Sequence, residues 1–102
     1  MSNYPSLSHA QIERLAFLSE ECGEVVQAIG KILRHGYDSY NPTVMDGPCN
    51  KEALEDELGH IQTAIRMLEQ SGDINARQIT KSAIRKIGTV EKWLHHQGLP
   101  NV

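Results

Sequence analysis

The sequence predicts an all-α protein, an antiparallel helical bundle with a long loop between its first and second helices. Three segments carry apolar residues at spacings of three and four, which is the period of an amphipathic helix. The segments between them are rich in glycine, proline and other turn-forming residues. No convincing strand pattern is present. The 102 residues suffice for one modest core, so we expect a single domain over residues 1–102.

The first predicted helix begins after Ser8 and ends at Gly36. Ser8 is a good N-cap residue, and Gln11 stands where a capping-box partner belongs. Glycine often ends helices because it adopts left-handed backbone angles at no steric cost, so Gly36 is the expected stop. The apolar stripe of this helix consists of Ile12, Leu15, Leu18, Cys22, Val25, Val26, Ile29 and Leu33.

Residues 36–50 form the predicted loop. Two prolines and several turn-forming residues exclude a continuing helix over this segment. A loop of about fifteen residues is long for so compact a domain, and loops of this kind are often functional. We interpret the segment either as a plain linker or as a substrate lid.

The second predicted helix starts at the N-cap Asn50 and ends at residues 71–72. The third starts after Asp73 or Asn75 and ends near Gly98, before a proline. The apolar stripes of the two helices consist of Leu54, Leu58, Ile61, Ile65 and Leu68, and of Ile79, Ala83, Ile87, Val90 and Leu94. In a domain this small, an apolar helix face stays exposed to water unless a second copy of the chain covers it. We therefore expect the bundle to be completed by homo-oligomerisation, as a homodimer or homotetramer.

Composition narrows the classes of partner and the compartment. The net charge is −3 with acids and bases interspersed, so neither nucleic acid nor an anionic membrane is an expected partner. No window approaches the roughly 20 apolar residues of a membrane span, and Met1–Ser8 does not resemble a signal peptide. Cys22 and Cys49 lack CxxC spacing, which favours a reducing compartment. We expect a cytoplasmic protein, of a bacterium or of a host cell if phage-encoded.

Several polar side chains lie on the packing flanks of the first two helices. At 100° per residue, Glu21 and Glu24 share a flank of the first helix with Phe17 and Ala28, whereas Glu20 turns outward. On the second helix, the same construction places a glutamate and a histidine, residues 57 and 60, on the shoulder of the apolar stripe. Residues three apart on a helix are neighbours, so each pair can converge on one point.

Packing of the two helices would bring Glu21, Glu24, Glu57 and His60 around a common cavity. Carboxylates that lie so close repel one another, and burying them unpaired is costly. A divalent cation resolves this conflict, and oxygen ligands favour Mg²⁺, with Mn²⁺ as the alternative. The other interpretation is that these acids simply lie on a solvated face.

The two acidic runs, EECGEV at residues 20–25 and EDELGH at residues 55–60, resemble the motifs of the MazG-like all-α NTP pyrophosphatases. Members of that family carry EExxE on one helix and ExxD on a second. The resemblance covers about residues 10–97. It implies Mg²⁺-dependent cleavage of a nucleoside triphosphate between the α- and β-phosphates, giving NMP and pyrophosphate. The small single-domain form resembles stand-alone phage or bacterial versions, which control dNTP pools or clear non-standard nucleotides. A purine deoxynucleotide such as dGTP is our preferred substrate.

The resemblance also assigns roles to residues of this chain. It implies that Glu20, Glu21, Glu24 and Glu57 are catalytic: the last three would bind the metal, and Glu20 would bind metal or orient the attacking water. His60 stands where the family has aspartate. Neutral imidazole ligates Mn²⁺ but is a poor Mg²⁺ ligand. His60 is therefore either a metal ligand or a hydrogen-bonding partner of a phosphate or of a metal-bound water.

Basic residues are needed for the remaining charge of a triphosphate, and a polar or aromatic group is needed for the base. The candidates are Lys31 and Arg34 before the loop, Lys81 and Arg85 on the third helix, and Tyr37 and Asn41 in the loop.

Two other functions stay open. One is a phosphoribosyl-ATP pyrophosphatase, whose typical second motif is not matched by residues 57–63. The other is a non-catalytic helical interaction module of the same fold.

Overall fold

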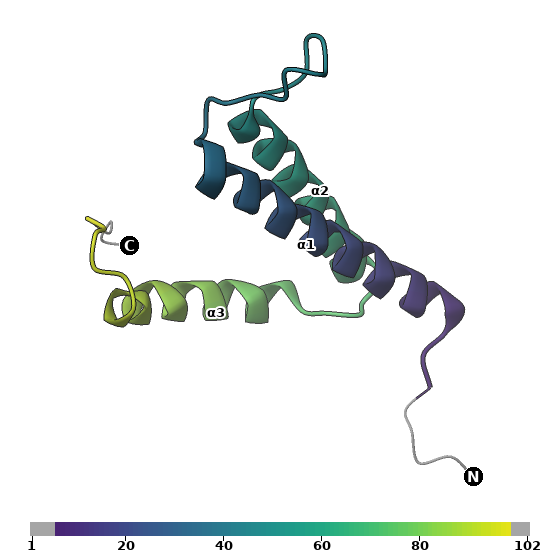
Figure 1. Ribbon diagram of the computed structural model, residues 1–102. Helices are drawn as coiled ribbons and strands as arrows, with labels where there is room; N and C mark the ends of the chain where they lie inside the picture. The colour runs from purple at the N-terminus through teal and green to yellow at the C-terminus, as the bar shows by residue number, and fades with distance from the viewer. Residues whose placement is uncertain (1–5, 99–102) are drawn as a thin grey trace.

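The computed structural model describes residues 6–98, and that part of the chain is all-helical, as predicted, with no strand. The helices are α1 (His9–His35), α2 (Asn50–Gln70), α3 (Ala76–Thr89) and the short 3-10 helix η1 (Val90–Lys92). Helices α1 and α2 lie side by side and antiparallel, while α3 points away from the pair (Figure 1). No helix in the described range is both long enough and apolar enough to cross a bilayer.

Both ends of α1 lie where the sequence predicts them. The Ser8 hydroxyl accepts a hydrogen bond from the Gln11 amide at 3.1 Å, and the Gln11 side chain accepts one from the Ser8 amide at 2.8 Å. This reciprocal pair is a capping box. At the other end Gly36 has φ 87°, and its N–H donates to the Ile32 carbonyl at 2.7 Å. A side chain at Gly36 would oppose that backbone angle.

The start of α2 differs from the prediction by one residue. Cys49, and not Asn50, is the N-cap, because the Glu52 carboxylate accepts a hydrogen bond from the Cys49 amide at 3.1 Å and closes the first turn there. The Asn50 side chain instead donates to the Gly36 carbonyl at 3.0 Å. Asn50 therefore joins the end of α1 to the start of α2.

The third helix is shorter than predicted. It starts after Asn75, whose side chain accepts from the amides of Arg77 and Gln78, but it ends at Thr89 and not near Gly98. Gly88 weakens the last turn by about 1 kcal/mol relative to alanine, and the Thr89 hydroxyl bonds back to the Lys86 carbonyl at 3.2 Å. The chain then tightens into η1. The expected end near Gly98 was wrong, because the spacing of apolar residues does not show where a glycine or a side-chain hydrogen bond ends the helix.

The core of the described part lies between α1 and α2. Ala28 on α1 and Ala64 and Leu68 on α2 are its buried apolar residues. The turn after α2 is tied to α1 by an ion pair in which Arg14 donates to both oxygens of Asp73, at 2.7 and 3.2 Å. This contact joins the turn after α2 to the N-terminal part of α1, while the Asn50–Gly36 hydrogen bond joins the opposite ends of the two helices.

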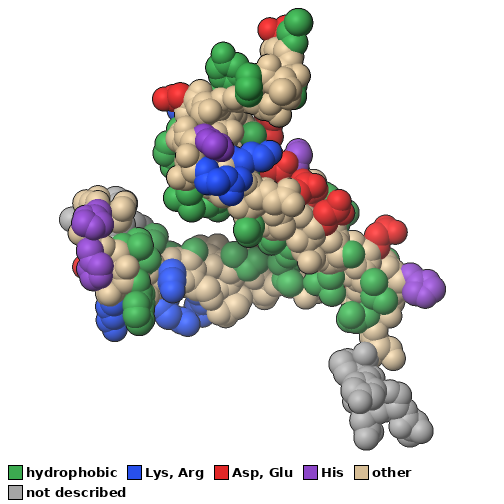
Figure 2. Space-filling model, viewed as in Figure 1, with side chains coloured by type: hydrophobic (Ala, Val, Ile, Leu, Met, Phe, Trp, Pro, Cys, Tyr) green, Lys and Arg blue, Asp and Glu red, His purple; other side chains and the backbone are tan. Residues whose placement is uncertain are grey.

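The helix α3 is left uncovered by the rest of the chain. Every residue from Ala76 to Thr89 is exposed, including Ile84 at 58 %. The radius of gyration is 17.6 Å, whereas a compact domain of about 100 residues has roughly 13 Å. Hydrophobic side chains lie on the surface of both the α1–α2 pair and α3 in Figure 2. A single copy of the chain therefore forms a two-helix hairpin with a third helix beside it, and no closed bundle.

The loop between α1 and α2 projects beyond the ends of both helices (Figure 1). Within it Tyr40 and Cys49 form an isolated antiparallel bridge, and the Asn41 side chain accepts hydrogen bonds from Thr43. The loop is thus held by its own turns.

Candidate metal centre

Two rows of side chains face each other across the α1–α2 interface. The row on α1 consists of residues 21, 24, 28 and 31, and the row on α2 of residues 50, 53, 57 and 60. Each row advances by three or four residues and so follows one helix face. Because the helices are antiparallel, Glu21 lies opposite His60 at one end, and Lys31 lies near Asn50 at the other.

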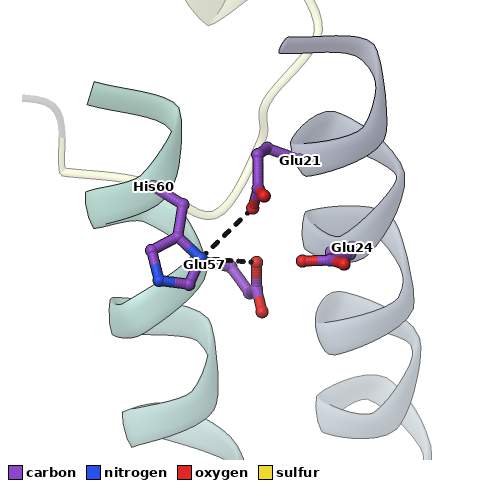
Figure 3. Close-up of side chains that lie close together, drawn as sticks. All are labelled: Glu21, Glu24, Glu57 and His60. Carbon is purple, nitrogen blue, oxygen red and sulfur yellow. Dashed lines mark hydrogen bonds and ion pairs between the residues drawn. The ribbon is translucent and has the colours of Figure 1, made fainter. Parts of the chain in front are cut away.

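The four predicted metal ligands come together in this interface. Glu21, Glu24, Glu57 and His60 each offer one ligand atom, and these atoms all lie within 4.8 Å of one another. His60 Nδ1 lies 3.2 Å from Glu21 Oε2 and 3.3 Å from Glu57 Oε2. Figure 3 shows the two side chains from α1 and the two from α2 pointing toward one another. The geometry is therefore the one expected from the helical phase of the two acidic runs.

Glu21 is the most buried of the four, with 9 % of its surface exposed. Its position on the flank beside Ala28 places its carboxylate inside the helix interface, where water cannot screen it well. Glu24 and Glu57 are half-buried, and the His60 side chain is 54 % exposed. Three carboxylates thus share a partly desolvated space. When His60 is protonated, it is the positively charged group next to them.

The pKa of His60 reflects these contacts. Partial desolvation lowers it, but hydrogen bonding to Glu57 and Glu21 and the attraction of both carboxylates outweigh that effect, so the pKa is raised above 6.5. The imidazolium is favoured by negative charge that nothing else in the cluster balances.

The donor set fits a divalent cation. An octahedral ion lies about 2.1 Å from each oxygen, so opposite ligand atoms are separated by roughly 4.2 Å. The span of 4.8 Å exceeds this by little, and small side-chain movements would close the shell. Four protein ligands leave coordination positions open, which a catalytic ion needs for its substrate.

A polar pocket of about 220 Å³ adjoins the cluster, because Glu24 and Glu57 line both. Lys31, predicted to bind substrate, lies on its wall. Gln27, Asn50 and Ala53 also line it, and none of them was among the predicted site residues. Two of them, Asn50 and Ala53, could have been found from helical spacing. They continue the row of Glu57 and His60 on the same face of α2, at intervals of four and three residues.

The other predicted site residues lie outside this pocket. Glu20 is exposed on α1 and does not belong to the cluster, and Arg34 is exposed in the last turn of α1. Tyr37 and Asn41 are exposed in the loop. Lys81 and Arg85 are exposed on α3, and the pocket is lined by residues of α1 and α2. Within one chain, the structure brings none of these residues to the pocket.

A model of the MazG nucleotide pyrophosphohydrolase domain matches residues 9–95 of the chain. The chain belongs to the MazG family. No curated protein and no solved structure matches it significantly. The matched region of this MazG domain includes all of α1, α2 and α3 and the whole acidic cluster. Membership of the family supports nucleotide pyrophosphohydrolase chemistry in general and a divalent cation as its helper.

Proposed function

We propose that the protein is a Mg²⁺-dependent nucleoside triphosphate pyrophosphohydrolase that converts a (d)NTP to (d)NMP and pyrophosphate. The observation that carries the proposal is the convergence of Glu21, Glu24 and Glu57 in a chain of the MazG family, with ligand atoms within 4.8 Å. The adjoining pocket supports it, because a substrate placed there would lie directly beside the cluster. The proposed role is control of dNTP pools or removal of unwanted nucleotides in the cytoplasm, bacterial or of a phage-infected host.

In this proposal Glu21, Glu24 and Glu57 hold the ion, and His60 offers a fourth ligand atom. The ion, when bound, neutralises phosphate charge and polarises the phosphorus that is attacked. Lys31 supplies a fixed positive charge on the pocket wall for the phosphates, and the side-chain amides of Gln27 and Asn50 offer hydrogen bonds to the substrate. Glu20 is the candidate to orient the attacking water and accept its proton.

A hydrolysis screen tests the proposal. The protein is incubated with standard and deoxy NTPs and Mg²⁺ or Mn²⁺, and pyrophosphate is resolved from orthophosphate. We expect pyrophosphate from at least one dNTP, with a purine such as dGTP preferred. Glu21→Gln and Glu24→Gln should each lower kcat/KM by roughly 100-fold or more, as removal of an electrostatic catalytic group does. Glu13→Gln, an exposed acid on the same helix, is the matched control and should retain activity.

The same screen separates the alternatives. A phosphoribosyl-ATP pyrophosphatase would hydrolyse that substrate and leave the dNTPs intact. A non-catalytic module of the same fold would hydrolyse none of them with either ion. Orthophosphate as the product, or full activity in Glu21→Gln, would contradict the assigned site.

We further propose that a second copy of the chain covers the exposed apolar surface, as a homodimer or a pair of dimers. On α1 the buried face carries Glu21 and Ala28, while Val26 and Leu33, on a different face, are 69 % and 82 % exposed. On α3 the isoleucines Ile79, Ile84 and Ile87 are 38 %, 58 % and 37 % exposed. Large apolar side chains left exposed on two helices favour an interface that covers them. A partner's third helix is also the route by which Lys81 and Arg85 would reach a pocket. Neither a nucleic acid nor a membrane is part of this proposal.

A further inference from the structure

His60 distinguishes this centre from one built of carboxylates alone. It stands at the last position of the second acidic run and points its Nδ1 atom at Glu21 and Glu57, at 3.2 and 3.3 Å (Figure 3). Those distances are close to the separation of neighbouring ligand atoms around one ion, roughly 3.0 Å for bonds of about 2.1 Å at right angles. The two contacts are hydrogen bonds between Nδ1 and the carboxylates, and the same spacing suits a nitrogen that shares one ion with both of them.

The direction of the ring also suits ligation. A neutral imidazole binds a cation through the nitrogen that lacks a proton, so Nδ1 can bind when the proton is on Nε2. The His60 side chain is 54 % exposed, so Nε2–H can donate to solvent without further cost. Glu24 completes the opposite side of the cluster, and no hydrogen bond to its carboxylate is found among residues 6–98. The donor set is thus three carboxylate oxygens and one nitrogen.

A nitrogen ligand changes which cation is favoured. Mg²⁺ binds hard oxygen ligands and keeps its waters, and imidazole adds little to its affinity. Mn²⁺ accepts the same carboxylates and also binds imidazole. Replacement of an oxygen by a nitrogen at one corner of the site therefore raises affinity for Mn²⁺ relative to Mg²⁺.

We propose that this centre selects Mn²⁺ over Mg²⁺ through direct ligation by His60 Nδ1. The inference rests on the proposed function, because it concerns the same site, but it replaces the Mg²⁺ of that proposal by Mn²⁺ as the preferred ion. It concerns ion binding and can fail separately. It predicts that the family's aspartate at this position would return the site to a set of four carboxylates that suits Mg²⁺.

Ion binding without nucleotide tests the inference. Dissociation constants for Mn²⁺ and Mg²⁺ are measured by calorimetry and by competition against the Mn²⁺ electron paramagnetic resonance signal. Pulsed resonance then detects ¹⁴N modulation from an imidazole bound to Mn²⁺. We expect ¹⁴N modulation in the unmodified protein. In His60→Asp the modulation should disappear, and the ratio of the Mg²⁺ to the Mn²⁺ dissociation constant should fall roughly tenfold.

Two further variants complete the design. His9→Asp makes the same substitution at an exposed residue in the first turn of α1, far from the cluster, and should keep both the modulation and the ratio. His60→Gln removes the imidazole without adding charge and should also lose the modulation, while circular dichroism checks that each variant is folded. Absence of ¹⁴N modulation in the unmodified protein, or a ratio unchanged in His60→Asp, overturns the inference.

The hydrolysis screen separates this failure from failure of the proposed function. Pyrophosphate release without ¹⁴N modulation overturns the Mn²⁺ inference and leaves the enzyme assignment standing. Nitrogen-ligated Mn²⁺ in a protein that hydrolyses no NTP supports the inference and overturns the enzyme assignment. Absence of any specific ion binding overturns both.

Discussion

Glu21 is a carboxylate in the position of a core residue. It lies in the same face of α1 as Ala28 and is as buried as that alanine, yet it carries a charge. Glu24 and Glu57 add two more charges within the same few ångströms. A cluster of this kind is unfavourable for a fold without a nearby cation, so we expect a bound metal ion to stabilise the hairpin.

The cost of the cluster can be measured by removing one charge. Glu24→Gln should raise the melting temperature of the metal-free protein by roughly 2–4 °C, about 0.5 kcal/mol, because one like-charge repulsion is lost. Added Mn²⁺ should stabilise the unmodified protein by about 2.7 kcal/mol at 100 times the dissociation constant. The same Mn²⁺ should stabilise Glu24→Gln less. Thermal melts with EDTA and with Mn²⁺ check this, and equal metal stabilisation of the two proteins would remove Glu24 from the site.

The cluster can be predicted from the positions of its residues around the two helices. Each helix carries two ligands on one turn, and packing of α1 against α2 is enough to bring the two pairs together. Glu21, Glu24, Glu57 and His60 were found in this way. Gln27 was not, because an amide on a helix surface carries no signal of its own. The places of Lys81 and Arg85 could not be derived either, since they depend on what α3 packs against.

At the scale of elements, the α1–α2 hairpin depends on its caps and on the contact between Arg14 and Asp73. The caps were predictable at Ser8, Gly36 and Asn75, because each residue type suits the backbone angles of its position. The ion pair was not predictable, because it joins residues 59 positions apart and depends on how the helices cross.

A pair of glycine substitutions tests the role of Gly36. Gly36→Ala should lower the free energy of unfolding by about 1 kcal/mol, because alanine opposes a φ of 87°. Gly23→Ala should raise it by up to about 1 kcal/mol, because Gly23 is inside α1 and a Cβ there meets nothing within 4 Å. Urea denaturation of both variants measures the two effects. The same sign for both would contradict the assigned helix end.

The ion pair predicts a pH dependence of stability. Hydrogen bonding to Arg14 lowers the pKa of Asp73 from 3.8, an effect that exceeds the opposing desolvation. A carboxyl group with a lowered pKa in the folded state stabilises the fold above its unfolded pKa and loses that effect as the pH falls through the folded value.

The corresponding variant is Asp73→Asn. It should be less stable than the unmodified protein at pH 7, and the difference should close as the pH falls below about 3.8. Melting temperatures at pH 7, 5, 4 and 3 check this. Asp38→Asn, in the exposed loop, is the control and should match the unmodified protein throughout. A difference for Asp73→Asn that persists unchanged to pH 3 would show that the carboxylate charge is not what stabilises the contact.

At the scale of the whole molecule, the described chain measures 54 × 38 × 23 Å and has an open angle between the hairpin and α3 (Figure 1). The all-α class follows from apolar spacing alone, because the period of three and four recurs in all three helices. The arrangement of α3 does not follow from the sequence. An amphipathic pattern indicates that one face of the helix packs against another surface, but it does not identify that surface.

Assembly gives the test at this scale. Light scattering coupled to size exclusion should report a dimer or tetramer of the 11.4 kDa chain. Ile84→Asp and Ile87→Asp should each shift the mass toward the monomer, since a charge on the apolar face of α3 opposes burial. Ser82→Asp, an exposed polar position on the same helix, should leave the mass unchanged. A monomeric unmodified protein with folded α3 would contradict the proposed assembly.

The cluster of Glu21, Glu24, Glu57 and His60 is proposed to serve hydrolysis between the α- and β-phosphates of a nucleotide. Hydrolysis of a deoxynucleoside triphosphate in ¹⁸O-labelled water, followed by ³¹P nuclear magnetic resonance, tests it most directly. We expect pyrophosphate and a nucleoside monophosphate as the products, with the label in the monophosphate, and a reaction strongly slowed in Glu24→Gln. Release of orthophosphate, label in the pyrophosphate, or no reaction with any nucleotide in either metal would contradict it.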